Sequence, residues 1–575
     1  MNLLVRYLKP FGWRMLLGFS IKVGGTLIEL LLPYILSHVL KVVVARQALE
    51  EILLWGGAMI VCATLAVDMN VIANRMAAAV SRDSSRMIRH DLFRRTLHLS
   101  AAQTDRFTIP SLESRLTTDT YNVHNFIGMM QRMGVRAPIL LVGGVCISLF
   151  MDRALATIML IIMPVVFALI FFISHHGVPL FTKVQTSVDN MIRVVREDTQ
   201  GIRVIKALSK QDYEHRRYDT VNRALIQDET RAKMVMSLIS PVMSMLMNGG
   251  IVAVVALAAF RVSDGRSDPE TVIAFMQYFT QIAMALMTIN RMFTMYTKCA
   301  ASAHRIAEVL DTPEDLAVCS EQEFPPVQTD AHICFDNVTF TYPTKKTHNL
   351  EQISFSLNKG DWLGIIGATG SGKSTLAKLL LRFYDVDEGS IRIHGRDIRT
   401  IPKDELYRMF GTAMQFDFLY ADTIEENIRF GRPLTHEQIQ QAAITAQAHD
   451  FISAREDGYD YMLSQKGTNI SGGQKQRLLI ARALAAKPEI LILDDSSSAL
   501  DYKTDAALRQ ALAEQATGCT VVTVAQRVSS IKDCDLILVL EEGRIIGMGD
   551  HEHLLATCPE YEQISQSQMG GAFVE

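Results

Sequence analysis

The chain has 575 residues, of which 49% are hydrophobic, and its formal net charge is -4. This length accommodates several domains, and the positive mean hydropathy makes the chain more apolar than an ordinary water-soluble enzyme. The near-neutral charge, without long runs of one sign, argues against nucleic acid as a partner. The eight cysteines form no CxxC pair, and neither they nor the fifteen histidines show a metal-ligand spacing, so we expect reduced thiols and ordinary histidines.

The N-terminal part of the chain is strongly apolar. Its first residues, MNLLVRYLKPFGWRM, lack the cleavage site of a signal peptide and predict a basic amphipathic helix on the inner membrane surface. Six long apolar stretches follow, and each is long enough for a helix that crosses a bilayer, which needs ~20 residues. They lie at roughly residues 15–44, 52–73, 127–150, 155–174, 234–260 and 272–296.

The connections between these stretches indicate their orientation. An even number of spans puts both termini on one side of the membrane, and the connection after the second span carries eight arginines, which favours the cytoplasmic side. We therefore expect a multi-pass protein of the cell (plasma) membrane with both termini in the cytoplasm. The two inner connections, about 74–126 and 175–233, have a helical pattern, so the spans should continue as helices into the cytosol.

Three ionisable residues fall within the predicted spans. Charged groups are unfavourable in lipid, so Glu29 and Asp68 are candidates for a substrate path. Lys22 lies near the expected edge of its span, where its long side chain could reach water. Its seven-residue separation from Glu29 is too long for a direct pair along one helix.

The composition changes near residue 320. The segment CSEQEFPPVQTDA contains two prolines and polar residues, as is typical of a linker. We place a membrane domain at residues 1–310, a linker at 311–330 and a soluble domain at 331–575. Short apolar strands alternate with helices in the last part, which predicts an α/β sheet with ligands at the strand ends.

The run GATGSGKST begins directly after an apolar strand pattern and opens a helical one. It fits GxxxxGK followed by Ser or Thr, a loop whose backbone N–H groups surround a polyphosphate. Lys373 supplies a cation for the β and γ phosphates, and the Ser374 hydroxyl is a ligand for Mg²⁺. The predicted phosphate loop consists of Gly367, Ala368, Thr369, Gly370, Ser371, Gly372, Lys373, Ser374 and Thr375.

Two further motifs accompany this loop. ILILDDSSSALD has the pattern of a buried strand ending in acids, which places Asp494 to hold Mg²⁺ through water. NISGGQKQRL puts Ser471, Gly472 and Gly473 at a helix start, a second site for an anion. In chain order, a phosphate loop, this serine-glycine element and the acid-capped strand resemble the ATP-binding cassette (ABC) family, and six spans ahead of the cassette resemble its exporter branch.

The resemblance covers nearly the whole chain. It implies an α-helical six-span transmembrane domain of the exporter type followed by an α/β P-loop nucleotide-binding domain, with ATP and Mg²⁺ as ligands. Tyr342 matches the aromatic residue that stacks on adenine, and Gln415 matches the glutamine that senses Mg²⁺, so Ser374, Gln415 and Asp494 form the expected metal set.

The same resemblance implies a second chain. Ser471, Gly472, Gly473 and Gln474 match the signature that closes over ATP held by a partner's phosphate loop, and Asp501 matches the aspartate that contacts the opposite cassette. Since this chain has one cassette, the functional unit is a dimer. The segments Ser111–Val123 and Glu197–Glu214 resemble the two intracellular coupling regions that dock on the cassettes.

Two positions depart from the family pattern. Asp495 stands where the family has the glutamate that activates water, and Gln526 replaces the histidine that contacts the γ phosphate. The shorter carboxylate weakens general-base assistance, and an amide carries no proton charge at neutral pH. Together these departures resemble the degenerate half of bacterial heterodimeric multidrug-type exporters, whose partner is a different chain carrying the catalytic Glu.

Other interpretations remain open. The chain could be an active homodimeric exporter in which Asp495 acts through a bridging water, a siderophore-type importer with the exporter fold, or a regulatory subunit that binds ATP structurally. A soluble cassette ATPase is excluded by the six spans. The expected cargo is a small amphipathic compound, drug or lipid, with no role for nucleic acid.

Overall fold

The computed structural model describes residues 2–46, 49–264, 268–343, 347–415, 418–496, 498–515 and 518–569. The chain divides into two compact units. The membrane unit comprises Met1–His98 and Pro110–Thr312, and the sheet unit comprises Leu99–Ile109 and Pro313–Glu575. The division along the chain thus falls after Thr312, and a short segment from the N-terminal half belongs to the sheet unit.

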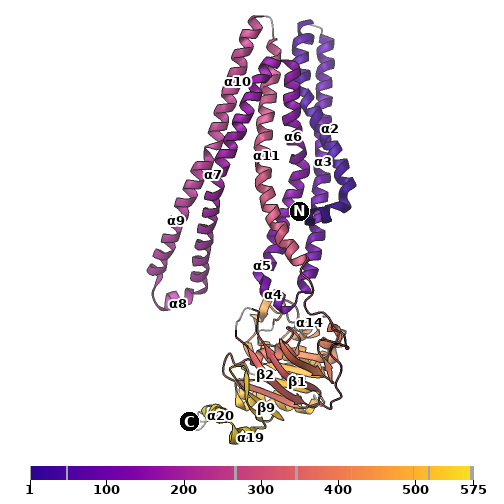
Figure 1. Cartoon of the computed structure of the whole chain (residues 1–575), viewed down its shortest axis with the longest axis vertical. Coiled ribbons are helices and arrows are strands. Elements are labelled where there is room, and N and C mark those ends of the chain that lie inside the picture. Colours follow the sequence, from indigo (N-terminus) through magenta and orange to yellow (C-terminus); the bar gives the residue numbers. More distant parts are fainter. Residues whose placement is uncertain are drawn as a thin grey trace. The chain divides into compact units, whose positions relative to one another are not determined.

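Over its described residues, the regular secondary-structure elements of the membrane unit are all helices (Figure 1). Six helical segments are long and apolar enough to cross a membrane, which confirms the predicted six spans. The third of them qualifies although it contains Arg132 and Arg136. The segments are Leu3–Val43, Leu49–Leu97, Ile109–Met151, Arg153–Gln200, Gln211–Ser263 and Pro269–Leu310. The helices of this unit are α1 (Asn2–Leu8), α2 (Gly12–His38), α3 (Leu49–Leu97), α5 (Ile109–Ser114), α6 (Thr120–Met151), α7 (Arg153–Gln200), α8 (Ile202–Ala207), α9 (Gln211–Ser237), α10 (Ile239–Ser263) and α11 (Pro269–Leu310).

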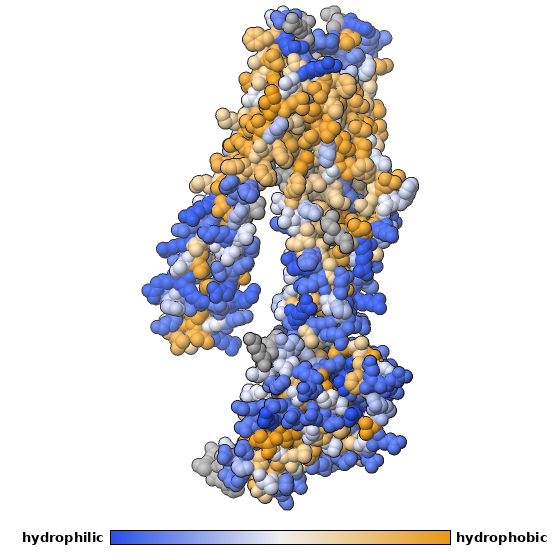
Figure 2. Space-filling view, viewed as in Figure 1, coloured by the Kyte–Doolittle hydropathy of each residue, from blue (hydrophilic) through white to orange (hydrophobic). Residues whose placement is uncertain are grey.

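Several helices are much longer than a bilayer. Helix α3 has 49 residues and is therefore roughly 74 Å long at 1.5 Å per residue, more than twice the ~30 Å hydrocarbon core. Within this unit, Figure 2 shows a mostly apolar surface along the upper part of the long helices and a mostly polar surface along their lower part. The predicted continuation of the spans into long polar helices is confirmed.

The helices of the membrane unit pack in two groups. Helix α2 runs along α3, and α6 packs on α2, α3 and α11, whereas α7, α9 and α10 form a second group that diverges from the first (Figure 1). The core between α2, α6 and α11 includes Leu30 and the fully buried Tyr278, whose hydroxyl donates to the Leu30 carbonyl at 2.7 Å. Small residues such as Gly143, against which Leu30 packs, allow this close approach.

The ionisable residues of the spans are placed differently from one another. The prediction that Lys22 reaches water was wrong, since its side chain is buried and its ammonium donates to Asn70 Oδ1 at 2.7 Å and Asn74 Oδ1 at 3.1 Å. The two amide oxygens of α3 satisfy the ammonium within the helix pair. Glu29 forms an ion pair with Arg136 at 2.5 Å, and Asp68 is exposed on α3.

The sheet unit contains two sheets, as expected for an α/β domain. One is antiparallel with strand order β2-β1-β4-β5; the other has the order β10-β9-β3-β8-β7-β6 and is parallel except for the edge strand β10. The strands are β1 (Ile333–Phe340), β2 (Leu350–Leu357), β3 (Trp362–Gly367), β4 (Glu388–Ile393), β5 (Arg396–Asp397), β6 (Phe410–Ala413), β7 (Ile490–Asp494), β8 (Thr520–Val524), β9 (Leu536–Glu541) and β10 (Arg544–Gly549).

Helices cover the parallel sheet. Every residue of β7 is buried, as is usual for a central parallel strand. The helices of the sheet unit are α4 (Ala101–Phe107), α12 (Lys373–Leu380), α13 (Lys403–Met409), α14 (Ile424–Arg429), α15 (His436–Thr445), α16 (His449–Ser453), α17 (Gly472–Leu484), α18 (Tyr502–Gln515), α19 (His551–Thr557) and α20 (Pro559–Met569). Parallel strands end at one edge, so the residues that follow β3, β6, β7 and β8 meet there.

Helix α4 is the short segment that joins the sheet unit from far away in the sequence. Ser100 caps it in a capping box with Gln103, and the Tyr384 hydroxyl donates to Asp105 Oδ2 at 2.6 Å. The predicted first docking region, Ser111–Val123, was therefore placed too late in the chain. Leu99–Ile109 is the segment that packs with the sheets. The linker-side residue Pro313 accepts a hydrogen bond from Gln103 and completes this attachment.

Candidate functional site

The predicted phosphate loop connects β3 to α12. Gly367 lies so close to the neighbouring strand that a Cβ there would stand 2.1 Å from the Leu540 carbonyl oxygen, and Gly372 adopts a φ of 103° just before the helix. Both positions therefore require glycine. The Lys373 ammonium folds back over the loop and donates to the carbonyls of Gly367 and Ala368 at 2.7 and 2.8 Å.

The groups around the loop fit a magnesium-bound polyphosphate. The Ser374 hydroxyl donates to Asp494 Oδ1 at 3.0 Å, which brings the two expected Mg²⁺ ligands together. Burial lowers the pKa of the Lys373 ammonium and raises the pKa of the Asp494 carboxyl. A bound anion and a bound cation would stabilise the charged forms of these two groups. The buried Ser371 hydroxyl, which has no hydrogen-bond partner among the described residues, fits the same ligand.

Asp495 is held by two amides. Its Oδ2 accepts a hydrogen bond from Gln415 Nε2 at 3.0 Å and another from Gln526 Nε2 at 2.9 Å. The other carboxylate oxygen, Oδ1, is buried without a hydrogen-bond partner in the described part of the chain. Asp495 also has a φ of 52°, in the left-handed region that few non-glycine residues adopt. Asp495, Gln415 and Gln526 follow β7, β6 and β8, respectively. This edge of the sheet therefore brings together the two residues that depart from the family pattern, Asp495 and Gln526, and the expected Mg²⁺ sensor, Gln415.

The predicted adenine platform lies beside the loop. The Tyr342 hydroxyl donates to Thr375 Oγ1 at 3.3 Å, and its ring meets the Tyr384 ring edge-on, with centroids 5.1 Å apart. The Lys378 ammonium lies 5.7 Å from the centre of the Tyr342 ring. These contacts fix the orientation of the Tyr342 ring, and its side chain remains partly exposed for stacking.

The signature residues begin α17. The Ser471 side chain accepts a hydrogen bond from the Gln474 N–H, and the Gln474 side-chain oxygen accepts one from the Ser471 N–H, in a capping box. A Cβ on Gly473 would lie 3.0 Å from the Ala499 carbonyl, whereas Gly472 is exposed. In the described part of the chain no hydrogen bond joins these residues to the phosphate loop, so the expected meeting of signature and phosphate loop is not made within one chain.

Asp501 lies at the start of α18. The Thr504 N–H and hydroxyl each donate to its carboxylate at 2.9 Å, and the backbone hydrogen bond in particular holds the pKa of Asp501 below its usual range. The side chain is nevertheless exposed, as the predicted contact with another cassette requires.

Sequence reasoning missed a residue that holds the Gln526 loop. Gln568, on the C-terminal helix α20, accepts a hydrogen bond from the Val528 N–H at 2.8 Å and donates one to the Gln526 carbonyl at 2.9 Å. Its side-chain amide therefore clamps both sides of Arg527. No local pattern marks this role, because Gln568 follows the loop by some 40 residues.

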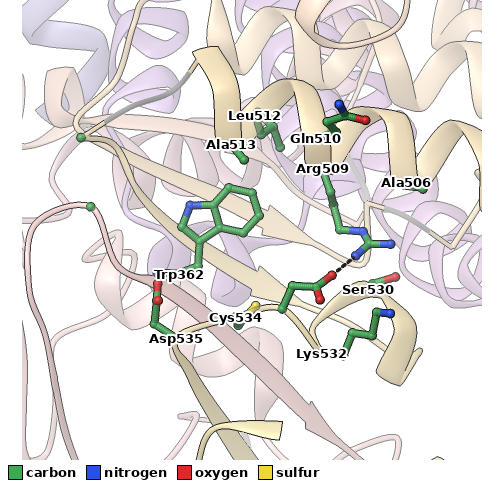
Figure 3. Close-up of a pocket in the computed structure, with 13 residues that line it drawn as sticks. Trp362, Ala506, Arg509, Gln510, Leu512, Ala513, Ser530, Lys532, Cys534 and Asp535 are labelled. Atoms are coloured by element: carbon green, nitrogen blue, oxygen red, sulfur yellow. Dashed lines mark hydrogen bonds and ion pairs between the residues drawn. The ribbon is translucent and has the colours of Figure 1, made fainter.

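A cavity of about 600 Å³ lies elsewhere in the sheet unit (Figure 3). Trp362 at the amino end of β3 and Arg509 on α18 line it, and Arg509 pairs with Asp533 at 2.8 Å. Since the phosphate loop follows the carboxyl end of β3, this cavity lies at the opposite end of that strand and is not the nucleotide site.

Comparison with known proteins identifies the two halves of the chain. Residues 15–286 match the family model of the ABC transporter transmembrane region, and residues 350–498 match that of the ABC transporter. The chain is 33% identical to the uncharacterized ABC transporter ATP-binding protein YfiB of Bacillus subtilis, over 98% of each chain. It is 31% identical to the uncharacterized ABC transporter ATP-binding protein MT1311 of Mycobacterium tuberculosis, over 100% of this chain and 99% of that one.

The fold is also that of a solved exporter. A bacterial Atm1-family ABC exporter structure with ATP bound matches with a TM-score of 0.80, at 24% identity and over 99% of both chains. The similarity covers the membrane helices and the nucleotide-binding domain together. The chain belongs to the ABC transporter family and is an exporter-type half-transporter, a multi-pass membrane protein with one transmembrane region fused to one transport ATPase domain.

Proposed function

We propose that this chain is one half of a heterodimeric exporter that moves small amphipathic compounds, drugs or lipids, and that its own ATP site hydrolyses slowly. The observation that carries this proposal is the state of Asp495. One of its carboxylate oxygens accepts two amide hydrogen bonds, and the other is buried. The oxygen with two amide donors has no lone pair left for the proton of an attacking water, and the other is closed to solvent in this arrangement.

The chemistry at this position explains the slow turnover. A general base must come within roughly 3 Å of the proton that it abstracts, and its loss lowers the rate by about 10²- to 10⁴-fold. Asp495 is one methylene shorter than the glutamate of the family pattern, and Gln415 and Gln526 hold it from two sides. Gln526 donates one of its two amide hydrogens to this carboxylate, so its side chain is turned toward Asp495 in this arrangement.

Nucleotide binding is retained. Lys373 and the N–H groups of the phosphate loop hold the β and γ phosphates of ATP, and Tyr342 stacks on adenine. Ser374, Asp494 and Gln415 would hold Mg²⁺, which neutralises phosphate charge when it is bound. Support comes from the 3.0 Å contact between Ser374 and Asp494 and from the burial of the Lys373 and Asp494 charges.

The faster site is assigned to the partner chain. Ser471 to Gln474 would close over ATP that is held by the phosphate loop of a different half-transporter, and that chain supplies the catalytic Glu. Asp501, exposed at the start of α18, would contact the opposite cassette. Helix α8, none of whose residues is buried, offers a second docking element within Glu197–Glu214.

The membrane half supports a cargo without a strong charge requirement. Glu29 is compensated by Arg136, so it offers no isolated negative charge to a cation. Asp68, exposed on α3, remains a candidate for the substrate path. The same proposal places the protein in the cell membrane with both termini in the cytoplasm, where ATP is available.

The test is the ATPase rate of the purified chain, alone and with its partner. We expect Asp495→Glu with Gln526→His to raise turnover at this chain's own site, measured in a complex whose partner site is inactivated, by about 10²-fold or more, because the longer carboxylate and an imidazole restore the missing groups. Asp495→Asn should change the rate of the two-chain complex less than twofold. Lys373→Ala is the control that removes ATP binding at this chain's own loop.

A homodimer gives the opposite result. If the chain alone hydrolyses ATP as fast as the complex and Asp495→Asn abolishes that rate, the slow-site proposal is wrong. Mass photometry of the chain expressed without a partner separates the two cases, since a stable homodimer forms from this chain alone and needs no different partner chain.

A further inference from the structure

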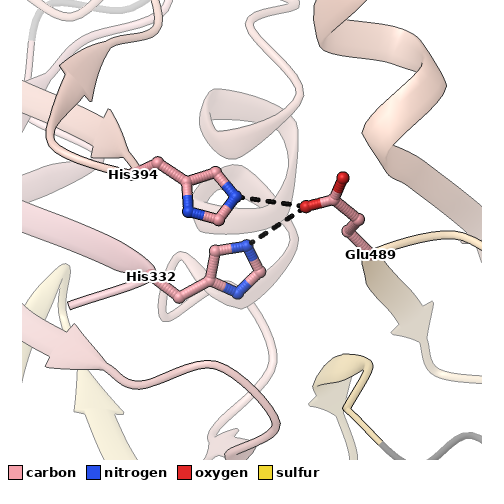
Figure 4. Close-up of side chains that lie close together, drawn as sticks. All are labelled: His332, His394 and Glu489. Carbon is pink, nitrogen blue, oxygen red and sulfur yellow. Dashed lines mark hydrogen bonds and ion pairs between the residues drawn. The ribbon is translucent and has the colours of Figure 1, made fainter. Parts of the chain in front are cut away.

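Three side chains lie close together at strand ends of both sheets. These are the strand ends away from the phosphate loop. His332 precedes β1, His394 lies in the turn between β4 and β5, and Glu489 precedes β7 (Figure 4). One ligand atom from each lies within 4.8 Å of the others. His394 Nε2 is 3.1 Å from Glu489 Oε2, and His332 Nε2 is 3.9 Å from the same oxygen.

His332 is the buried member of this group. Its residue is 2% exposed, and its Nε2 has no hydrogen-bond partner among the described residues although it points toward Glu489. A buried polar atom without a partner is unfavourable, by an amount comparable to the loss of a hydrogen bond. The unused nitrogen is therefore a sign that a ligand belongs between the three side chains.

The other ring nitrogen of His332 is fixed. Its Nδ1 lies 2.7 Å from Thr520 Oγ1, and that hydroxyl also accepts the Gly360 N–H at 3.0 Å. Metal-binding histidines usually have their second nitrogen engaged in this way, which orients the ring.

We propose that His332, His394 and Glu489 form a binding site for a divalent transition-metal cation of the Zn²⁺ class. Two imidazoles and one carboxylate are a ligand set that such cations accept, with water filling the remaining positions. His394 and Glu489 side chains are 45% and 47% exposed, so the cation can enter from solvent and water can reach it.

Small side-chain movements complete the coordination. Bond lengths of about 2.0–2.1 Å in a tetrahedral site put neighbouring ligand atoms roughly 3.3 Å apart, close to the observed 3.1 and 3.9 Å. The backbone holds the two histidines in register, because the His394 N–H donates to the His332 carbonyl at 2.9 Å. The exposed Glu489 and His394 side chains can make the remaining adjustment.

The position of the site indicates a structural role. The ligands come from β1 and the β4–β5 turn of the antiparallel sheet and from β7 of the parallel sheet, so a bound cation would tie the two sheets together. Glu489 and Asp494 lie at opposite ends of β7, which separates this site from the phosphate loop. The positive charge of Lys359 acts on both His332 and Glu489 and opposes metal binding.

Zinc titration of the full-length chain tests the proposal. The protein is expressed without a histidine tag, treated with a chelator and titrated with Zn²⁺ against a chromophoric competitor in excess Mg²⁺. We expect His394→Ala and Glu489→Gln each to bind one fewer Zn²⁺ per chain than the unmodified protein, or to bind it at least about tenfold more weakly. Lys359→Gln should bind it more tightly.

The matched control is His436→Ala. The His436 side chain is 52% exposed and pairs with Glu425 at 2.8 Å. Among the described residues, these two belong to no group of three or more residues that could hold a metal ion. This variant should retain the zinc stoichiometry. Cobalt substitution adds a spectroscopic readout, since the visible absorption of Co²⁺ should change from the six-coordinate to the four-coordinate type in the unmodified protein and His436→Ala only.

Folding of the variants is checked by ATP binding, which takes place at the other end of β7. If the folded His394→Ala and Glu489→Gln variants bind Zn²⁺ with the stoichiometry and affinity of the unmodified protein, the site does not exist, and His394 and Glu489 are an ordinary surface pair. Equal loss in His436→Ala would also overturn the assignment. Either result leaves the slow-site proposal untouched, because no metal other than Mg²⁺ enters it.

Discussion

Asp495, Gln415 and Gln526 follow three separate strands and meet at one carboxylate oxygen. Each is unremarkable alone, but two amide donors on one carboxylate oxygen leave it no acceptor capacity for water. Gln568 acts one step further away, since it touches only the backbone on either side of Arg527. It is a positioning residue for the loop that carries Gln526.

The first prediction concerns this clamp. Gln568→Ala removes the acceptor of the Val528 N–H, and a hydrogen bond of about 1 kcal/mol corresponds to roughly fivefold faster amide exchange. Hydrogen exchange of a peptide covering residues 526–531 measures the change. Gln566→Ala, on the same helix, removes an exposed contact to Glu562 and should leave that peptide unchanged. Equal protection in both variants would show that the clamp does not hold the loop.

At the scale of elements, α4 has the most unusual placement. Its sequence lies between two membrane helices, yet Ala101 and Ala102 pack on the core of the sheet unit and Asp105 accepts the Tyr384 hydroxyl hydrogen bond. Burial raises the pKa of Tyr384, so this hydroxyl stays protonated and donates throughout the physiological range. Apolar packing and one hydrogen bond to a carboxylate therefore attach the helix to the sheet unit.

The second prediction tests this attachment. Hydrogen bonds to charged groups contribute about 1.5–3 kcal/mol, so Tyr384→Phe should speed amide exchange of residues 101–107 by about tenfold or more. Asp105→Ala should have the same effect, and the double variant should add little, because both remove one contact. Tyr407→Phe, on α13, is the control for loss of a hydroxyl. Additive effects of the two variants would contradict a direct coupling.

At the scale of the whole molecule, one chain provides half of each composite site. The phosphate loop and the signature are both present, but the capping box of Ser471 is satisfied within α17 and makes no contact with the loop among the described hydrogen bonds. A signature that closes over the phosphate loop would therefore have to come from a second cassette. The exporter fold with a single transmembrane region fits this requirement, since ABC exporters function as dimers.

The third prediction separates capping from function in the complex. Ser471→Ala and Thr435→Ala each remove a capping-box hydroxyl, from α17 and α15, and each should lower stability by about 1 kcal/mol. Only Ser471→Ala should lower turnover of the two-chain complex, on the order of 10²-fold, because it also removes a donor to the partner's ATP. Photolabelling with an azido-ATP should show unchanged labelling of this chain's own loop. Equal turnover in the two variants would contradict the assigned role.

Much of this protein could be predicted from local sequence. The six spans follow from apolar runs long enough for a bilayer, and the phosphate loop follows from nine consecutive residues whose glycines and lysine act within one turn. The strand of Asp494 was equally clear from its apolar run. The docking segment was misplaced by about ten residues, since helix pattern alone does not reveal which short helix packs on a distant sheet.

What the sequence determined by itself was therefore what short stretches of chain decide: hydrophobic length, strand and helix pattern, and the phosphate-binding turn. Only the tertiary structure decided which distant side chains meet. Lys22 is satisfied by Asn70, Asp495 is held by Gln415 and Gln526, and His332 faces Glu489. The physical reason is that hydrogen bonds and metal coordination depend on distances of 2–4 Å between atoms, which packing sets and sequence separation does not encode.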